Sequence, residues 1–148
     1  MKSDHHAYIA LTRWLPIVTG LLMICLFFIL RALNLNYILK FHFLNILIIV
    51  PAVWLTCRAG YKRNGENFRY LKGLASGVKT IIIASVIVNF FIVIYLSFIN
   101  PVMMFNIRHY MQLGEYMNPL IIGMVLFTEQ ICASLIVSLI VMQLYKAS

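Results

Sequence analysis

Two polar residues stand side by side inside a long apolar stretch near the end of the chain. They are Glu129 and Gln130, within the sequence GMVLFTEQICASLIVSL of residues 123–139. A carboxylate surrounded by hydrocarbon is strongly disfavoured unless it is neutral, pairs with a cation or contacts another polar group. Glu129 is therefore expected to be a polar latch between helices, a contact to another subunit, or the coupling site of a proton or cation carrier.

Helical spacing indicates where a polar partner for Glu129 lies. Gln130, Ser134 and Ser138 recur every four residues, so they share one face of a helix, and Glu129 borders that face. In the preceding apolar run, Asn89 falls at about the same depth as Glu129. We therefore predict an intramembrane polar contact between Asn89 and the last helix, formed there by Glu129, Gln130 and Ser134. The arc of the last helix that carries these residues is expected to face protein.

Other kinds of chemistry find no support in the sequence. The chain has no paired acids at helical spacing, no nucleophile beside a base and no phosphate-cradling loop. Cys25, Cys57 and Cys132 lie within or at the end of apolar runs without CxxC spacing, which argues against a disulfide framework or a zinc site. Four methionines near His109 are better explained as apolar filler than as copper ligands. We expect a non-enzymatic protein with no cofactor and no metal.

The polar residues must be positioned by helices that cross a membrane. The 148-residue chain is 63% hydrophobic and 11% charged, too apolar to cover itself with polar surface in water. Four apolar runs approach the length of about 20 residues that a membrane helix needs. We predict one all-α integral membrane domain, residues 1–148, with four transmembrane helices at about 14–30, 41–57, 74–99 and 120–145.

The charged residues indicate how these helices are oriented. Most of the 12 Lys and Arg residues lie in the N-terminal segment, between residues 58 and 79, or in the tail, whereas only Arg31, Lys40 and Arg108 lie elsewhere. The positive-inside rule then places both termini in the cytoplasm, with Trp14 as an interfacial anchor on that side. The formal net charge of +8 therefore reports membrane topology, and nucleic-acid binding is not expected.

Two stripes of residues at the start of the third apolar run predict contacts. Gly73 and Gly77 form a GxxxG motif, which Ala84 continues, and such small residues allow close helix packing within one bundle or against another subunit. On a different stripe, the basic residues form either a solvated face or a contact for anionic lipid headgroups or an acidic partner. These basic residues are Arg69, Lys72 and Lys79.

The second half of the chain resembles a known family. The stretch GYKRNGENFRYLKGLASGVKTIIIASVIVNFFIVIYLSFINP, residues 60–101, combines a basic Tyr-Lys-Arg segment, a turn with a glycine, and a glycine-containing helix that ends at Ile-Asn-Pro. Together with the ending SLIVSLIVMQLYK, residues 134–146, it is similar to the family called domain of unknown function 4199. Members of that family are small four-span inner-membrane proteins of Bacteroidota. The resemblance implies this topology and a bacterial inner-membrane location, but no activity and no site residues.

These observations favour an accessory or scaffolding subunit of a larger inner-membrane complex. Its partners would be the lipid bilayer, other membrane protein subunits and anionic lipid, but not nucleic acid. One alternative is a small ion-coupled carrier that uses Glu129 as its coupling site. A second alternative is a membrane companion that presents lipid phosphate to a glycosyltransferase through its basic loop.

Overall fold

The computed structural model describes residues 2–33, 42–64, 70–110 and 114–146, and the side chains within them except those of residues 2–12, 42–43, 62–64, 110 and 145–146. The regular elements in these ranges are all helical. In chain order they are α1 (Lys2–Ala32), η1 (His42–Asn45), α2 (Ile46–Asn64), α3 (Tyr70–Ile94), η3 (Tyr95–Ile99), α4 (Pro101–Tyr110), η4 (Gly114–Tyr116) and α5 (Pro119–Lys146).

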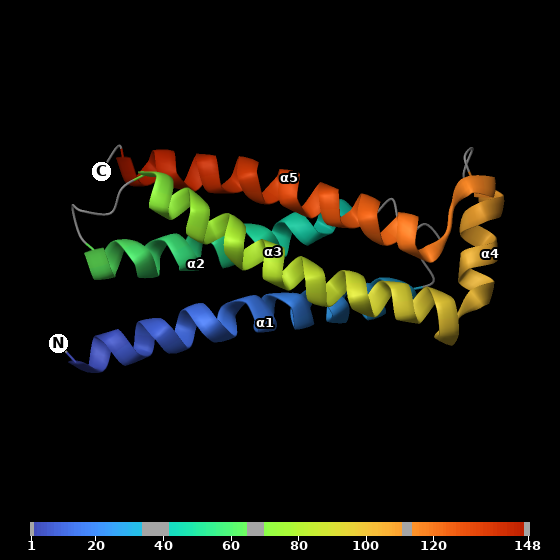
Figure 1. Ribbon diagram of the computed structural model, residues 1–148, viewed down its shortest axis with the longest axis horizontal. Coiled ribbons are helices and arrows are strands. Elements are labelled where there is room, and N and C mark those ends of the chain that lie inside the picture. The colour runs from blue at the N-terminus through green and yellow to red at the C-terminus, as the bar shows by residue number, and fades with distance from the viewer. Residues whose placement is uncertain (1, 34–41, 65–69, 111–113, 147–148) are drawn as a thin grey trace.

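The four long helices lie side by side along the long axis of the molecule (Figure 1). Their direction alternates along the chain, so the start of α1 and the end of α5 lie at the same end of the bundle (Figure 1). We call this the termini end, and α4 lies across the opposite end. Because α3 packs against α1, α2 and α5, it is the central helix of the bundle.

Three of the described helices are long and apolar enough to cross a membrane. These segments are Arg13–Ala32, Tyr70–Ile99 and Pro119–Leu144, whereas the apolar part of α2, Ile46–Tyr61, is shorter. The prediction of an all-helical protein with several membrane-spanning helices is confirmed at this level. The second helix differs from its predicted range of 41–57, because α2 begins at Ile46 after the short helix η1 and continues through the basic segment to Asn64.

Two Asn-Pro pairs begin the helices at the far end of the bundle. The side-chain Oδ1 of Asn100 accepts a hydrogen bond from the backbone N of Met103 at 3.1 Å, and Oδ1 of Asn118 accepts one from the backbone N of Ile121 at 2.8 Å. Each asparagine is thus an N-cap, and the proline that follows occupies the first helical position, where a missing N–H costs nothing. These pairs therefore do more than interrupt the preceding helix.

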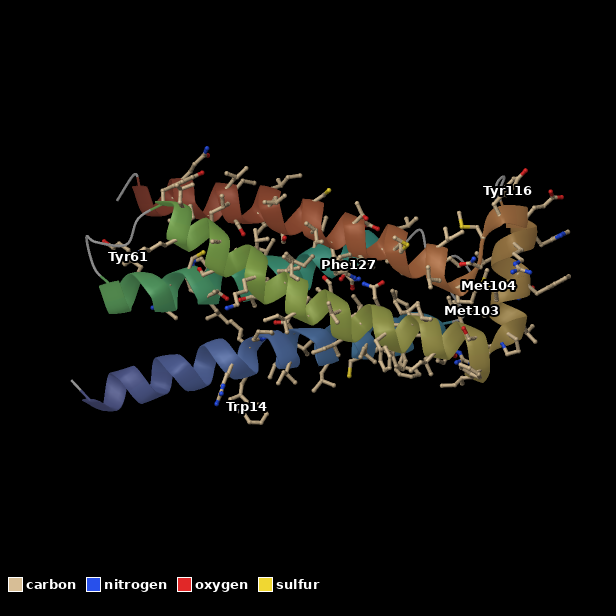
Figure 2. The ribbon with its side chains drawn as sticks, viewed as in Figure 1. Trp14, Tyr61, Met103, Met104, Tyr116 and Phe127 are labelled. Carbon is tan, nitrogen blue, oxygen red and sulfur yellow. The ribbon has the colours of Figure 1, made fainter. Side chains whose placement is uncertain are left out.

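Helix α4 closes the far end of the bundle with its apolar side. Met104 is buried in the core, and Met103 and Ile107 pack against that core. Figure 2 shows Met103 and Met104 directed from α4 toward the bundle. The opposite side of α4 exposes Val102 and Phe105. The methionines of this segment therefore fill the end of the bundle.

An aromatic cluster holds α1 against α3 near the same end. The ring of Phe27 lies edge-on to the rings of Phe91 and Tyr95, with centroids 5.9 and 5.2 Å apart. Phe28 contacts the same two rings. The guanidinium of Arg31 lies 5.1 Å from the centroid of the Tyr95 ring. These contacts hold α1 against α3, which runs in the same direction (Figure 1).

Candidate functional site

Two glycines set the distance and the register between α3 and α5. A Cβ atom added to Gly77 would lie 2.6 Å from Oγ of Ser138, so the two helices touch at this point. A Cβ atom added to Gly123 would lie 3.0 Å from a methyl group of Val93 and 3.5 Å from Oδ1 of Asn89. The helices are therefore antiparallel, with Gly77 beside Ser138 and Asn89 beside Gly123.

A layer of buried polar side chains lies between these two contacts. By the register of α3 and α5, Gln130 falls at the level of Ser85, about half-way along the bundle. Gln130 is 1% exposed and Ser85 is 0% exposed, whereas Asn89 is half-buried. In the membrane that the apolar surface implies, this level corresponds to the hydrocarbon interior.

The short helix η1, directly before α2, adds a fourth residue to this layer. Sγ of Cys57 lies 3.7 Å from the carbonyl of Gly73, and the Cβ position of Gly77 lies 3.1 Å from a methyl group of Val53. These antiparallel contacts bring buried Asn45, just before the start of α2, to the depth of the same layer. We refer to Asn45, Ser85, Asn89 and Gln130 as the mid-bundle polar layer.

One hydrogen bond of this layer stays within α3. Nδ2 of Asn89 donates to the backbone carbonyl of Ser85 at 2.8 Å. Among the described residues, Oδ1 of Asn89 and Oγ of Ser85 have no hydrogen-bond partner. A buried polar atom without a partner costs about 1–3 kcal/mol. These two oxygen atoms therefore lower the stability of the bundle.

Glu129 lies outside the part of α5 that faces the other helices of this chain. Its side chain is exposed on the outer surface of α5, together with its neighbours Thr128 and Cys132. Gln130 and Ser134 lie on the inner surface, where they are 1% and 0% exposed. Consecutive residues of a helix are about 100° apart, so the two adjacent polar residues point to different surroundings. The structure brings Gln130 close to α3 and leaves Glu129 facing outward.

The predicted small-residue stripe lies entirely inside the bundle. Gly73, Gly77 and Ala84 are all buried. The carbonyl of Gly73 lies 3.7 Å from Sγ of Cys57 on α2, and the carbonyl of Ala84 lies 3.3 Å from the Cβ position of Gly20 on α1. Of the two possibilities that the sequence leaves open, packing within one bundle accounts for these residues.

The basic stripe is on the outer surface, as far as the structure describes it. Lys72 and Lys79 are exposed on α3, and Arg69 lies outside the described residues. A contact between Arg58 and Trp54 on α2 was not expected from the sequence. The guanidinium of Arg58 lies 4.9 Å from the centroid of the Trp54 ring. Their spacing of four residues places them on one helix face, and this is the sequence signal that could have revealed the pair.

The comparisons with known proteins identify a family without a described activity. The family model described as "Protein of unknown function (DUF4199)" matches residues 17–147. This range contains the mid-bundle polar layer and the three membrane-spanning segments, except for the first four residues of the first segment. A search of the curated proteins and a search of the solved structures each returned no match.

Proposed function

The chain belongs to the DUF4199 family, and from this premise we propose that it is a non-enzymatic accessory or scaffolding subunit of a larger membrane complex. The observation that carries the proposal is the exposure of Glu129 in the middle of α5. A carboxylate at that depth is strongly disfavoured against lipid tails, and a helix of another subunit with a cation or a hydrogen-bond donor would shield it. The contact surface is the outer side of α5 around Thr128, Glu129 and Cys132.

The small-residue and serine stripes do not contribute to this proposal. Gly77 and Ser138 contact each other, and Ser134 is fully buried, so these residues are already used between helices of the same chain. A partner subunit would instead meet a surface that is apolar apart from the Glu129 region. Charge complementarity therefore defines the partner: a membrane helix with Lys, Arg or His at mid-depth.

We further propose a bacterial inner-membrane location with four spans and both termini in the cytoplasm. Residues 45–61 of η1 and α2 run from the mid-bundle polar layer to the termini end, so they would supply half of the fourth span. The described cations of the termini end outnumber those of the opposite end, which supports this orientation under the positive-inside rule. They are Arg13, Arg58, Lys72 and Lys79, against Arg31 and Arg108.

Thiol cross-linking tests the proposed contact in native membranes. Cys132 is exposed one turn from Glu129, and replacing Cys25 with Ser and Cys57 with Ala leaves it as the only thiol. We expect a short cross-linker at Cys132 to join the chain to one membrane protein in near-stoichiometric yield, and Glu129→Leu to abolish the product. A thiol at the exposed position Val86 on α3, in a chain without other cysteines, is the control and should yield no such product. Equal cross-linking from both positions would contradict the proposal.

A small ion-coupled carrier is the second candidate, and the mid-bundle polar layer favours it. Asn89 and Ser85 place polar oxygen atoms inside the bundle near the level of Glu129. If Cys132 cross-links mainly to a second copy of the chain, a homo-oligomeric carrier becomes the better explanation. In that case Glu129→Gln should abolish uptake by vesicles that contain the purified protein, because the variant has no carboxylate to couple to an ion.

A further inference from the structure

We propose that Trp54 and Arg58 on α2 form a binding site for the headgroup of an anionic phospholipid at the termini end of the bundle. The guanidinium of Arg58 lies 4.9 Å from the centroid of the Trp54 ring, in a cation–π contact. Both side chains are exposed, and Trp54 is 39% exposed. The indole thus restricts the guanidinium while leaving its donors accessible to a ligand from the membrane.

The packing contacts place this pair at the boundary between hydrocarbon and headgroups. The contact of Gly20 with Ala84 puts Trp14 on α1 at the level of Val78 on α3. Figure 2 shows Trp14 directed away from the bundle. Two tryptophans at one level are typical of a membrane interface, where the amphipathic indole is favoured.

Contacts between α2 and α3 place Trp54 at that level too. Val53 lies beside Gly77, and Thr56 lies beside Thr80, so Trp54 falls close to Lys79. From Lys79 to Ile99 the central helix extends about 30 Å at a rise of about 1.5 Å per residue. If one boundary of the hydrocarbon layer is placed at Ile99, where the apolar segment ends, a thickness of about 30 Å puts the other boundary at the level of Lys79 and Trp54. Arg58, one turn nearer the termini end, is then at the depth of the phosphates.

Charge selects an anionic lipid as the ligand. The other exposed cations of the termini end are Arg13, Lys72 and Lys79. The carboxylates with described side chains lie elsewhere: Glu115 at the opposite end and Glu129 in mid-bundle. Arg58 therefore has a positive local field and no described acid to neutralise it. A planar guanidinium can donate two parallel hydrogen bonds to a phosphate, which a lysine ammonium cannot.

The two tryptophans of the chain allow a direct test in vesicles. The variant Trp14→Phe leaves Trp54 as the only indole. The full-length chain is placed in phosphatidylcholine vesicles with a fixed, small fraction of brominated lipid, which is either phosphatidylglycerol or phosphatidylcholine. Bromine quenches tryptophan fluorescence at short range, so the ratio of the two quenching constants reports which lipid occupies the surroundings of Trp54. We expect a ratio of about 5 in favour of phosphatidylglycerol, the preference that one cation near the membrane surface confers.

Two matched variants separate this site from the general attraction of a basic protein. Arg58→Gln should lower the ratio to about 1. The control variant Arg108→Gln removes an exposed arginine at the opposite end and should leave the ratio unchanged. A combined Lys72→Gln and Lys79→Gln variant should retain a ratio well above 1. A ratio near 1 with Arg58 present, or a ratio that Arg58→Gln leaves unchanged, would overturn the proposal.

Discussion

Adding one methyl group at Gly77 is expected to weaken the packing of α3 against α5. The new Cβ would lie 2.6 Å from Oγ of Ser138 and 3.1 Å from a methyl group of Val53, and both distances are shorter than ordinary van der Waals contact. Overpacking of this kind typically costs about 1–3 kcal/mol. Alanine also favours a helix over glycine by about 1 kcal/mol. We therefore expect Gly77→Ala to lower the free energy of unfolding by up to about 2 kcal/mol.

A double-mutant cycle with Ser138 identifies the cause of that loss. Oγ of Ser138 is buried and has no hydrogen-bond partner among the described residues, so Ser138→Ala alone should be neutral or slightly stabilising. In the double variant the closest contact disappears, and Cβ of residue 138 lies 3.5 Å from the new methyl group, an ordinary contact distance. We expect Ser138→Ala to restore more than half of the stability lost in Gly77→Ala.

Reversible unfolding in mixed micelles of mild and denaturing detergent, followed by circular dichroism, measures these free energies. Ala75→Leu, at an exposed position of α3, is the control for added volume outside the bundle and should change stability little. The assigned contact between α3 and α5 would be refuted if Gly77→Ala were more stable than the natural chain by the full helix-propensity gain of about 1 kcal/mol. It would also be refuted if the losses of the single and double variants were equal.

Three further substitutions test other contacts. Asn118→Ala removes the side-chain acceptor of the Ile121 N–H and should cost about 1 kcal/mol, with faster amide exchange in the first turn of α5 as the local measurement. Thr56→Val removes the hydroxyl contact with Thr80 and should cost about 0.6 kcal/mol, whereas the same change in a Thr80→Val background should cost less. Arg31→Gln removes the cation above Tyr95 and should cost about 0.5–1 kcal/mol in the same unfolding assay, a loss that Arg31→Lys should partly avoid.

The helices could be predicted from the sequence because their cause is local. Long apolar runs, bounded by basic residues or by Asn-Pro, are sufficient to predict α1, α3 and α5, since the lipid solvent imposes both length and composition. The limits of α2 could not be predicted in this way. The segment after Cys57 is basic, but it continues the helix to Asn64, because Lys and Arg are compatible with a helix that leaves the membrane.

Which residues face each other depends on helix register and on three-dimensional packing, and a single sequence does not specify either. The small stripe of α3 was equally compatible with an internal contact and with a second subunit until Ser138 was found beside Gly77. Similar depth made Asn89 a reasonable partner for Glu129, but depth alone does not give the direction in which a side chain points. Asn89 faces the small residue Gly123 and donates to its own helix.

The orientation of Glu129 changes what the polar pair on α5 means. If both polar residues served the stability of the bundle, both would face α3, as Gln130 does. Leucine or isoleucine at position 129 would satisfy a lipid-facing helix surface at no electrostatic cost, as at the exposed positions Leu135 and Ile136. A carboxylate at an outward-facing position of a membrane helix is costly. Under the subunit proposal a partner helix on the outer side of α5 offsets this cost, and Glu129→Leu, together with cross-linking at Cys132, is the experiment that tests it.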